Sequence, residues 1–207
     1  MLKIGVLVSG GGTNLQAVID KVHKKSGEIA VVIANNADAY GLIRAKKSDI
    51  PTEIILEKDY ESNDAFNTKM IETLKEYGVE LVVLAGYMKI ITTSFVKAYP
   101  DRIINIHPAL IPSFCGEGYY GMKVHKAVIR YGVKVTGATV HFVNEKADAG
   151  PIIAQKTVAV MDDDTPESIQ KKVLEIEHTL LPKVVEQYCL GNIHVNGRHV
   201  SIENGGK

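Results

Sequence analysis

Short apolar runs alternate with stretches of helical periodicity along the first half of the chain. Each run is continuous and bounded by turn-forming residues, as in strands of a sheet that is covered on both faces. The predicted strands span residues 2–8, 29–34, 52–56, 80–85 and 102–107. Between them, apolar spacing predicts helices at 14–24, 40–48, 61–77 and 92–98. This alternation predicts an α/β fold with an open, mostly parallel twisted sheet and helices on both faces.

The pattern changes after residue 110. A glycine-punctuated loop leads into a predicted helix at 122–131 and a strand-like alternation at 134–143. The apolar run at 151–160 either pairs with that strand as a hairpin or extends the sheet. Asp164 or Thr165 can cap the last long helix, with Pro166 in its first turn, and an apolar stripe continues to about residue 189.

The chain is expected to form one domain over residues 1–190, because no linker, repeat or low-complexity stretch interrupts it. The polar tail at 191–207 predicts a short hairpin around Asn196-Gly197.

Charge and composition exclude several classes of partner. The 24 basic and 24 acidic residues give a formal net charge of zero, which leaves no basic field for a nucleic acid or an anionic membrane. The two cysteines have neither disulfide-scaffold nor metal-ligand spacing, so we expect a reducing compartment. No apolar stretch reaches the roughly 18 residues of a membrane span, and no signal-peptide cleavage site follows the first strand. These features predict a cytoplasmic protein with neither a nucleic acid nor a membrane as its partner.

The first predicted strand runs directly into Ser9-Gly10-Gly11-Gly12-Thr13-Asn14 and then into a helix. This order places free backbone N–H groups and the positive helix end at the carboxyl edge of the sheet, an arrangement typical of phosphate binding. No Gly-Lys-Ser/Thr follows, and Leu15 replaces the third glycine of a dinucleotide-binding loop. One phosphate is therefore the favoured ligand, and a tight turn without a ligand is the alternative.

Asn105 and His107 end a buried strand, and their spacing places both side chains on one face. An amide and an imidazole can together stabilise an oxygen that gains negative charge during acyl transfer. The alternative is a core histidine beside a turn-forming asparagine. Asp148, in a later loop, is a candidate to orient the imidazole and favour its charged form, although aspartate is also common in turns.

The other candidate residues carry weaker signals. His23 and His125 lie among lysines and are expected to be solvated, while His141 falls within a predicted strand without an assigned role. No histidine, cysteine and carboxylate group has metal-ligand spacing, so no metal is predicted. Cys115 has no basic neighbour in sequence that would activate its thiol.

Four separated motifs, together with Glu177-His178, resemble the glycinamide ribonucleotide formyltransferases, a family of folate-dependent enzymes of purine synthesis. The motifs are VLVSGGGTNLQA at 6–17, VVLAGYMKII at 82–91, INIHPALIPSF at 104–114 and TVHFVNEKADAGPIIAQ at 139–155. The resemblance covers about residues 2–190 and implies a Rossmann-like formyltransferase fold. It implies transfer of the formyl group of 10-formyltetrahydrofolate, a cosubstrate, to glycinamide ribonucleotide, with no metal or prosthetic group.

The resemblance also implies roles for individual residues. Asn105, His107 and Asp148 would be catalytic, with Asp148 keeping His107 charged. The ribonucleotide would be held at its phosphate and its ribose by Gly12, Thr13, Asn14 and Glu177. The folate would contact Asn63, Met88, Lys89, Ile90, Ile91, Asn105, Asn144, Glu145, Lys146, Ala147 and Asp148. We expect a monomer or a weak homodimer.

Three features depart from the family pattern. Asn63 replaces an arginine that some members carry near the folate tail, so the tail's carboxylates are expected to be held less strongly. Ala149 replaces a glycine, which would shift the loop if that position needs a positive φ. The stretch 115–124 is longer than in compact members and lies beside the expected cleft.

Three other functions are compatible with parts of this pattern. A deformylase would use the same three residues to give the formyl group to water, but such relatives carry an extra N-terminal domain. A methionyl-tRNA formyltransferase would need a basic C-terminal domain, whereas only about 17 residues follow the last predicted helix. A non-catalytic phosphate sensor would leave Asn105, His107 and Asp148 unexplained.

Overall fold

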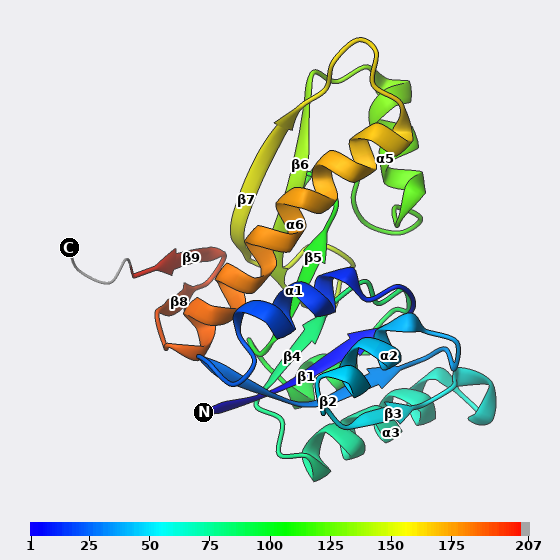
Figure 1. The fold of residues 1–207 in the computed structure, drawn as a ribbon, viewed down its shortest axis with the longest axis vertical. Helices are drawn as coiled ribbons and strands as arrows, with labels where there is room; N and C mark the ends of the chain where they lie inside the picture. Colours follow the sequence, from blue (N-terminus) through cyan, green and yellow to red (C-terminus); the bar gives the residue numbers. More distant parts are fainter. Residues whose placement is uncertain (204–207) are drawn as a thin grey trace.

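The computed structural model describes residues 1–203, which form a seven-stranded sheet and a separate two-stranded hairpin (Figure 1). The main sheet has the strand order β3-β2-β1-β4-β5-β6-β7. Its strands are β1 (Leu2–Val8), β2 (Gly27–Ala34), β3 (Thr52–Ile54), β4 (Leu81–Leu84), β5 (Ile103–His107), β6 (Val135–Phe142) and β7 (Ile152–Ala159). The hairpin consists of β8 (Ile193–Asn196) and β9 (His199–Ile202), at the place where the sequence predicts a turn.

Six α-helices and one short 3-10 helix (Glu57–Asp59) connect the strands of the described residues. The α-helices are α1 (Thr13–Lys21), α2 (Tyr40–Lys47), α3 (Asn63–Glu76), α4 (Thr93–Ala98), α5 (Met122–Tyr131) and α6 (Pro166–Cys189). The helix predicted to reach residue 24 ends at Lys21, because the chain turns into β2 with Lys24 at φ 59°.

The predicted fold class is confirmed. Strands β1 to β5 pair in parallel, whereas β6 pairs antiparallel with both β5 and β7. The two alternatives for the run at 151–160 are both realised. Strand β7 forms a hairpin with β6, and it also extends the main sheet.

Apolar side chains pack on both faces of the sheet. On β1, Ile4, Val6 and Val8 join one buried cluster with residues of α1, α2 and α6, while Leu7 joins a second cluster with residues of α3 and α4. Successive side chains of a strand point to opposite faces, so the continuous apolar run of β1 supplies both clusters.

The strand order creates a ligand-binding edge. From β1 the chain proceeds to β2 on one side and later returns to β4 on the other, which is the topological switch point where open α/β sheets bind ligands. The glycine loop leaves the sheet at the end of β1, and His107 stands at the end of β5. Functional candidates that are far apart in sequence are thereby brought to one edge.

The last helix begins with a reciprocal cap. The Thr165 hydroxyl accepts a hydrogen bond from the Ser168 N–H at 3.2 Å, and the Ser168 hydroxyl accepts one from the Thr165 N–H at 2.9 Å. Of the two predicted caps, Thr165 is therefore the one used. Asp164 instead accepts hydrogen bonds from Ser168 and Lys172.

Gly150 offers a test of how the fold holds the loop before β7. A Cβ at this position would lie 1.8 Å from the carbonyl oxygen of Phe142, a backbone atom of β6 that cannot move independently. We expect Gly150→Ala to lower the free energy of unfolding by at least about 2 kcal/mol in urea denaturation. Gly10→Ala is the control, because a Cβ there meets nothing within 4 Å, and it should change stability by less than about 0.5 kcal/mol. Equal stabilities of the two variants would contradict this account.

Candidate active site

Two neighbouring cavities open at the ligand-binding edge of the sheet. One, here called the α6 cavity, has a volume of about 230 Å³ and is lined by side chains that include Asn14, His107, His125 and Glu177. The other, here called the loop cavity, has a volume of about 340 Å³ and is lined by residues 87–91 and the loop before β7. Asn105 and Asp148 line both cavities, so the two spaces meet at these side chains.

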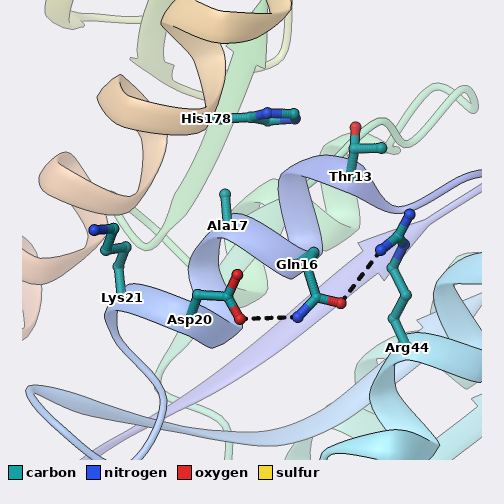
Figure 2. Close-up of a pocket in the computed structure, with 7 residues that line it drawn as sticks. All are labelled: Thr13, Gln16, Ala17, Asp20, Lys21, Arg44 and His178. Carbon is teal, nitrogen blue, oxygen red and sulfur yellow. Dashed lines mark hydrogen bonds between the residues drawn. The ribbon is translucent and has the colours of Figure 1, made fainter.

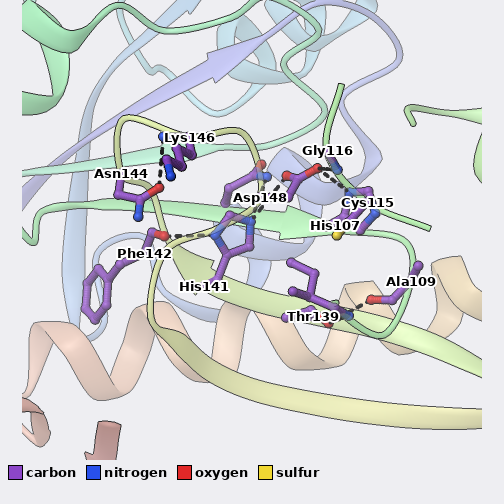
Figure 3. A network of polar contacts seen from close by, with 12 residues as sticks. His107, Ala109, Cys115, Gly116, Thr139, His141, Phe142, Asn144, Lys146 and Asp148 are labelled. Carbon is purple, nitrogen blue, oxygen red and sulfur yellow. Dashed lines mark hydrogen bonds and ion pairs between the residues drawn. The ribbon is translucent and has the colours of Figure 1, made fainter. Parts of the chain in front are cut away.

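The carboxylate of Asp148 is the centre of a polar network between the cavities (Figure 3). Its Oδ2 accepts a hydrogen bond from the Gly116 N–H at 2.9 Å and lies 3.4 Å from Nδ1 of His107. Its Oδ1 lies 3.6 Å from Nε2 of His141. The carboxylate therefore stands between two imidazole rings, on a loop 41 residues after His107 and seven residues after His141.

Backbone strain accompanies this position. Asp148 has a φ of 52°, a left-handed conformation that non-glycine residues adopt infrequently, although aspartate tolerates it better than most. Ala149 is not among the residues with positive φ. The replacement of a glycine by Ala149 therefore strains nothing, because the preceding residue makes the turn.

The protonation state of the network follows from burial and charge. Burial raises the pKa of Asp148, but the adjacent imidazole of His141, the charge of His107 and the Gly116 N–H outweigh it and hold this pKa below its ordinary value. Burial lowers the pKa of His107, against the opposing effects of Asp148 and the Phe114 carbonyl. The negative charge of Asp148 thus favours the charged form of His107, but burial is the stronger effect and the net shift of the His107 pKa is downward.

Both ring nitrogens of His107 face oxygen acceptors. Nε2–H donates to the carbonyl oxygen of Phe114 at 2.8 Å, while Nδ1 faces the Asp148 carboxylate. A neutral imidazole carries one N–H and cannot serve both acceptors, whereas an imidazolium can. The geometry therefore prepares His107 to take up a proton once a negative charge enters the cavity.

His141 is a site residue to which the sequence assigned no role. It lies directly opposite Asn105 in the β5–β6 pair, and its Nδ1–H donates to the Phe142 carbonyl at 2.8 Å. Its Nε2 then accepts a hydrogen bond from Nδ2 of Asn105 at 3.2 Å. This contact orients the Asn105 amide and leaves its second N–H available to the cavities. The only available signal was cross-strand register, which cannot be determined before the sheet order is known.

The glycine loop forms a separate hollow of about 350 Å³ with residues 85, 86 and 88. Gly12 is the N-cap of α1, so the first N–H groups of this helix have no partners within the helix and face outward. Gly12 has a φ of 66°, and a Cβ there would lie 2.6 Å from Cα of Gly41. This position therefore requires glycine for packing, and its substitution would disturb the loop itself.

Arg44 of α2 contacts both the glycine loop and α1, and Figure 2 shows its hydrogen bond to Gln16 of α1. Its Nε donates to the Gly11 carbonyl at 2.8 Å, and Nη1 donates to Oε1 of Gln16 at 3.3 Å. These contacts fix the loop in the conformation that exposes the N-terminus of α1.

Glu177 and Asn14 form a buried pair in the lining of the α6 cavity. Nδ2 of Asn14 donates to Oε2 of Glu177 at 2.7 Å, and only 6% of Glu177 is exposed. Burial raises the pKa of Glu177 from 4.5 to about 7, although the hydrogen bond from Asn14 opposes the shift. Near neutral pH this carboxyl group thus exists in both protonation states.

The residues expected at the folate are partly brought together. The loop cavity is lined by Met88, Lys89, Ile90, Ile91, Asn105, Asn144, Glu145, Ala147 and Asp148. Lys146 is not among the lining residues, and its N–H instead donates to Oδ1 of Asn144. Asn63 lies at the start of α3, where its carbonyl and side-chain oxygens accept hydrogen bonds from Asn67. Their roles stay predictions, as do those of the other site residues.

Two expectations about histidines are wrong. His125 is only 2% exposed and lines the α6 cavity, because α5 turns it inward while the adjacent Lys123 and Lys126 point to solvent. His23 lies beyond the end of α1 and is half-buried, with Nδ1 accepting a hydrogen bond from the Ile29 N–H. The lysines near His125 in sequence indicate only the exposed face of α5, and His125 lies on the buried face.

Sequence reasoning also missed three tyrosines. Both cavities are lined by Tyr87, Tyr119 and Tyr120.

Three further observations concern metal binding, cysteine reactivity and membrane-spanning helices. Within residues 1–203, no group of three histidine, cysteine or acidic side chains could hold a metal ion. Burial raises the pKa of the Cys115 thiol, which disfavours a nucleophilic thiolate. None of the helices in that range is long and apolar enough to cross a membrane.

Comparison with known proteins gives a consistent result. Residues 2–185 match the family model described as formyl transferase. The chain is 40% identical over 197 residues to a phosphoribosylglycinamide formyltransferase of Haemophilus influenzae, covering 94% of this chain and 91% of the relative. It matches the glycinamide ribonucleotide transformylase 1 structure of Symbiobacterium toebii with a TM-score of 0.92 and 42% identity, covering 98% of this chain and 94% of the other.

Some relatives are longer than this chain. It is 42% identical over 190 residues to the chloroplastic phosphoribosylglycinamide formyltransferase of Arabidopsis thaliana, which covers 90% of this chain and 65% of the relative. It is 42% identical over 196 residues to the trifunctional purine biosynthetic protein adenosine-3 of Gallus gallus, covering 94% of this chain but only 19% of the relative.

The buried carboxyl of Glu177 predicts a specific pH dependence of stability. Because its folded pKa of about 7 lies above its ordinary value of 4.5, the protonated form stabilises the fold below about pH 4.5, and this contribution is lost as the pH rises through about 7. Glu177→Gln mimics the protonated form. We expect the variant to match the parent near pH 5 and to be more stable at pH 8, by on the order of 3 kcal/mol in urea denaturation. The exposed Glu175→Gln on the same helix should show no such divergence, and parallel curves for the Glu177 variant and its parent would contradict the shift.

Proposed function

Since the chain belongs to the formyl transferase family, we propose that it transfers the formyl group of 10-formyltetrahydrofolate to the amine of glycinamide ribonucleotide in de novo purine biosynthesis. The names of the relatives support this acceptor. The observation that carries the proposal is that Asn105 and Asp148 line both cavities. A formyl group carried in one cavity can therefore meet an amine held in the other.

The ribonucleotide occupies the α6 cavity and the adjoining glycine loop in this proposal. The unpartnered N–H groups at the start of α1 bind its phosphate, together with Gly12, Thr13 and Asn14. Glu177 accepts hydrogen bonds from the ribose hydroxyls. Because a carboxylate is the better acceptor, bound ribose favours the ionised form of this group.

The folate occupies the loop cavity, whose apolar residues and backbone groups suit a flat heteroaromatic ring. Met88 to Ile91 and the loop from Asn144 to Asp148 contact the pterin, and Asn63 lies nearer the tail. Because residue 63 is asparagine rather than arginine, it offers no guanidinium group to bind the carboxylates of this tail.

The chemistry proceeds through a tetrahedral intermediate. The acceptor amine attacks the formyl carbon, and the free N–H of Asn105 and protonated His107 donate hydrogen bonds to the oxyanion. His107 Nε2–H leaves the Phe114 carbonyl to do so. Asp148 keeps His107 charged and assists transfer of the amine's proton to the departing folate nitrogen, directly or through water. The carbon–nitrogen bond to folate then breaks, and the formylated product carries the new bond.

We extend the proposal to the setting of the reaction. No bound metal or prosthetic group takes part, and the protein is a monomer or a weak homodimer in the cytoplasm. The two cysteines, which form no disulfide, suit a reducing compartment.

Formyl transfer from 10-formyltetrahydrofolate, measured with and without glycinamide ribonucleotide, tests the proposal. We expect release of tetrahydrofolate only when the ribonucleotide is present, with one formylated ribonucleotide per turnover. Release without the ribonucleotide would identify a hydrolase, and the absence of any release would indicate a non-catalytic phosphate-binding protein.

Asp148→Asn tests the assignment of the carboxylate. Losing the negative charge removes the support for imidazolium at His107, so kcat should fall by about 10³-fold or more, while the affinity for glycinamide ribonucleotide in calorimetry stays nearly unchanged. The exposed Asp163→Asn is the control and should retain full turnover. Near-normal kcat in the Asp148 variant would rule out this role.

A further inference from the structure

His125 is a buried polar residue that the proposed reaction leaves unused. It lies on α5, among the inward-facing residues Val124, Ala127 and Val128, and only 2% of it is exposed. Every neighbour on this inner helix face is apolar, so helical packing alone does not require an imidazole there.

Neither ring nitrogen of His125 has a hydrogen-bond partner within residues 1–203. Its Nδ1 is fully buried without a partner, and no hydrogen bond joins Nε2 to another side chain or to the backbone in that range. A neutral imidazole carries one donor and one acceptor, and leaving buried polar atoms unpaired lowers the stability of the fold. An unpaired buried polar group that also lines a cavity is a candidate to bind a polar ligand there.

The surroundings of His125 identify the side from which a partner can come. The ring lines the α6 cavity together with His107 and Asp148. Burial and the charge of His107 lower the pKa of His125 to about 4, so the ring is neutral near pH 7. His125 does not line the separate hollow of the glycine loop.

We propose that His125 binds the glycinamide end of the acceptor, hydrogen-bonding its amine or amide through a neutral imidazole. The inference rests on the proposed function and adds a specificity-determining residue to it. A neutral ring can hold the nucleophilic end of the acceptor without placing a second positive charge beside His107. Glu177 and the glycine loop then hold the ribose and the phosphate, and His125 holds the part of the molecule that distinguishes this acceptor from other ribose phosphates.

His125→Phe separates this role from a structural one. Phenylalanine keeps an aromatic ring in an apolar environment and removes the unpaired nitrogens, so the melting temperature should stay equal or rise. The KM for glycinamide ribonucleotide should rise about tenfold or more, whereas the KM for 10-formyltetrahydrofolate should change less than about twofold. His125→Gln, which restores a donor and an acceptor, should recover part of the lost affinity.

Ribose 5-phosphate serves as the probe for the position of the contact. It carries the phosphate and the ribose but no glycinamide, so its inhibition constant against glycinamide ribonucleotide should be unchanged in His125→Phe. His23→Phe, at a half-buried histidine outside both cavities, is the matched control and should leave both KM values unchanged.

The outcomes distinguish failure of this inference from failure of the proposed function. If the parent protein transfers formyl groups but His125→Phe keeps its KM for the ribonucleotide, His125 is a structural residue and the inference is wrong. Equal weakening of ribose 5-phosphate and the ribonucleotide would also overturn it, because the contact would then lie at the ribose or the phosphate. If the parent transfers no formyl group to the ribonucleotide, the proposed function itself fails.

Discussion

The half-buried carboxylate of Asp148 is the constraint on which the site depends. It stands between the rings of His107 and His141 and accepts the Gly116 N–H. An isolated carboxylate at this depth would be strongly disfavoured, so these contacts must form together. They join the end of β5, the strand β6, the loop after Pro112 and the loop before β7 into one unit.

The polarity of the parallel strands explains why this unit faces two cavities. Parallel strands present their carboxyl ends on one edge, and the switch point between β1 and β4 opens that edge between two sets of loops. The glycine loop and α6 enclose one side, while residues 87–91 and the loop before β7 enclose the other. Two ligands can therefore approach one carboxylate and one amide from opposite sides, which a reaction between two bound substrates requires.

Several polar groups in the α6 cavity are held in states that cost stability. Burial brings the pKa of Glu177 to about 7, and His125 is neutral and unpaired. Oδ1 of Asn14 is also buried without a partner within residues 1–203. Apolar residues at these positions would make a more stable protein, so we interpret the polar lining at Asn14, His125 and Glu177 as preparation for a polar ligand.

The sequence by itself determined the sheet, the helices and the positions of the glycine loop, Asn105 and His107, because period, turn residues and strand ends are local properties of the chain. The sequence also indicated Asp148, because an amide and an imidazole still lacked a carboxylate to orient the imidazole.

Only the tertiary structure decided that His141 orients Asn105, since that contact depends on the register of β5 against β6. The inward position of His125 was likewise invisible, because neighbouring lysines describe one face of a helix and packing against α6 selects the other. The tertiary structure also decided that Asp148, rather than Ala149, adopts the left-handed backbone conformation in this loop. Sequence patterns record what each segment prefers, whereas burial, register and protonation depend on what the other segments bring beside it.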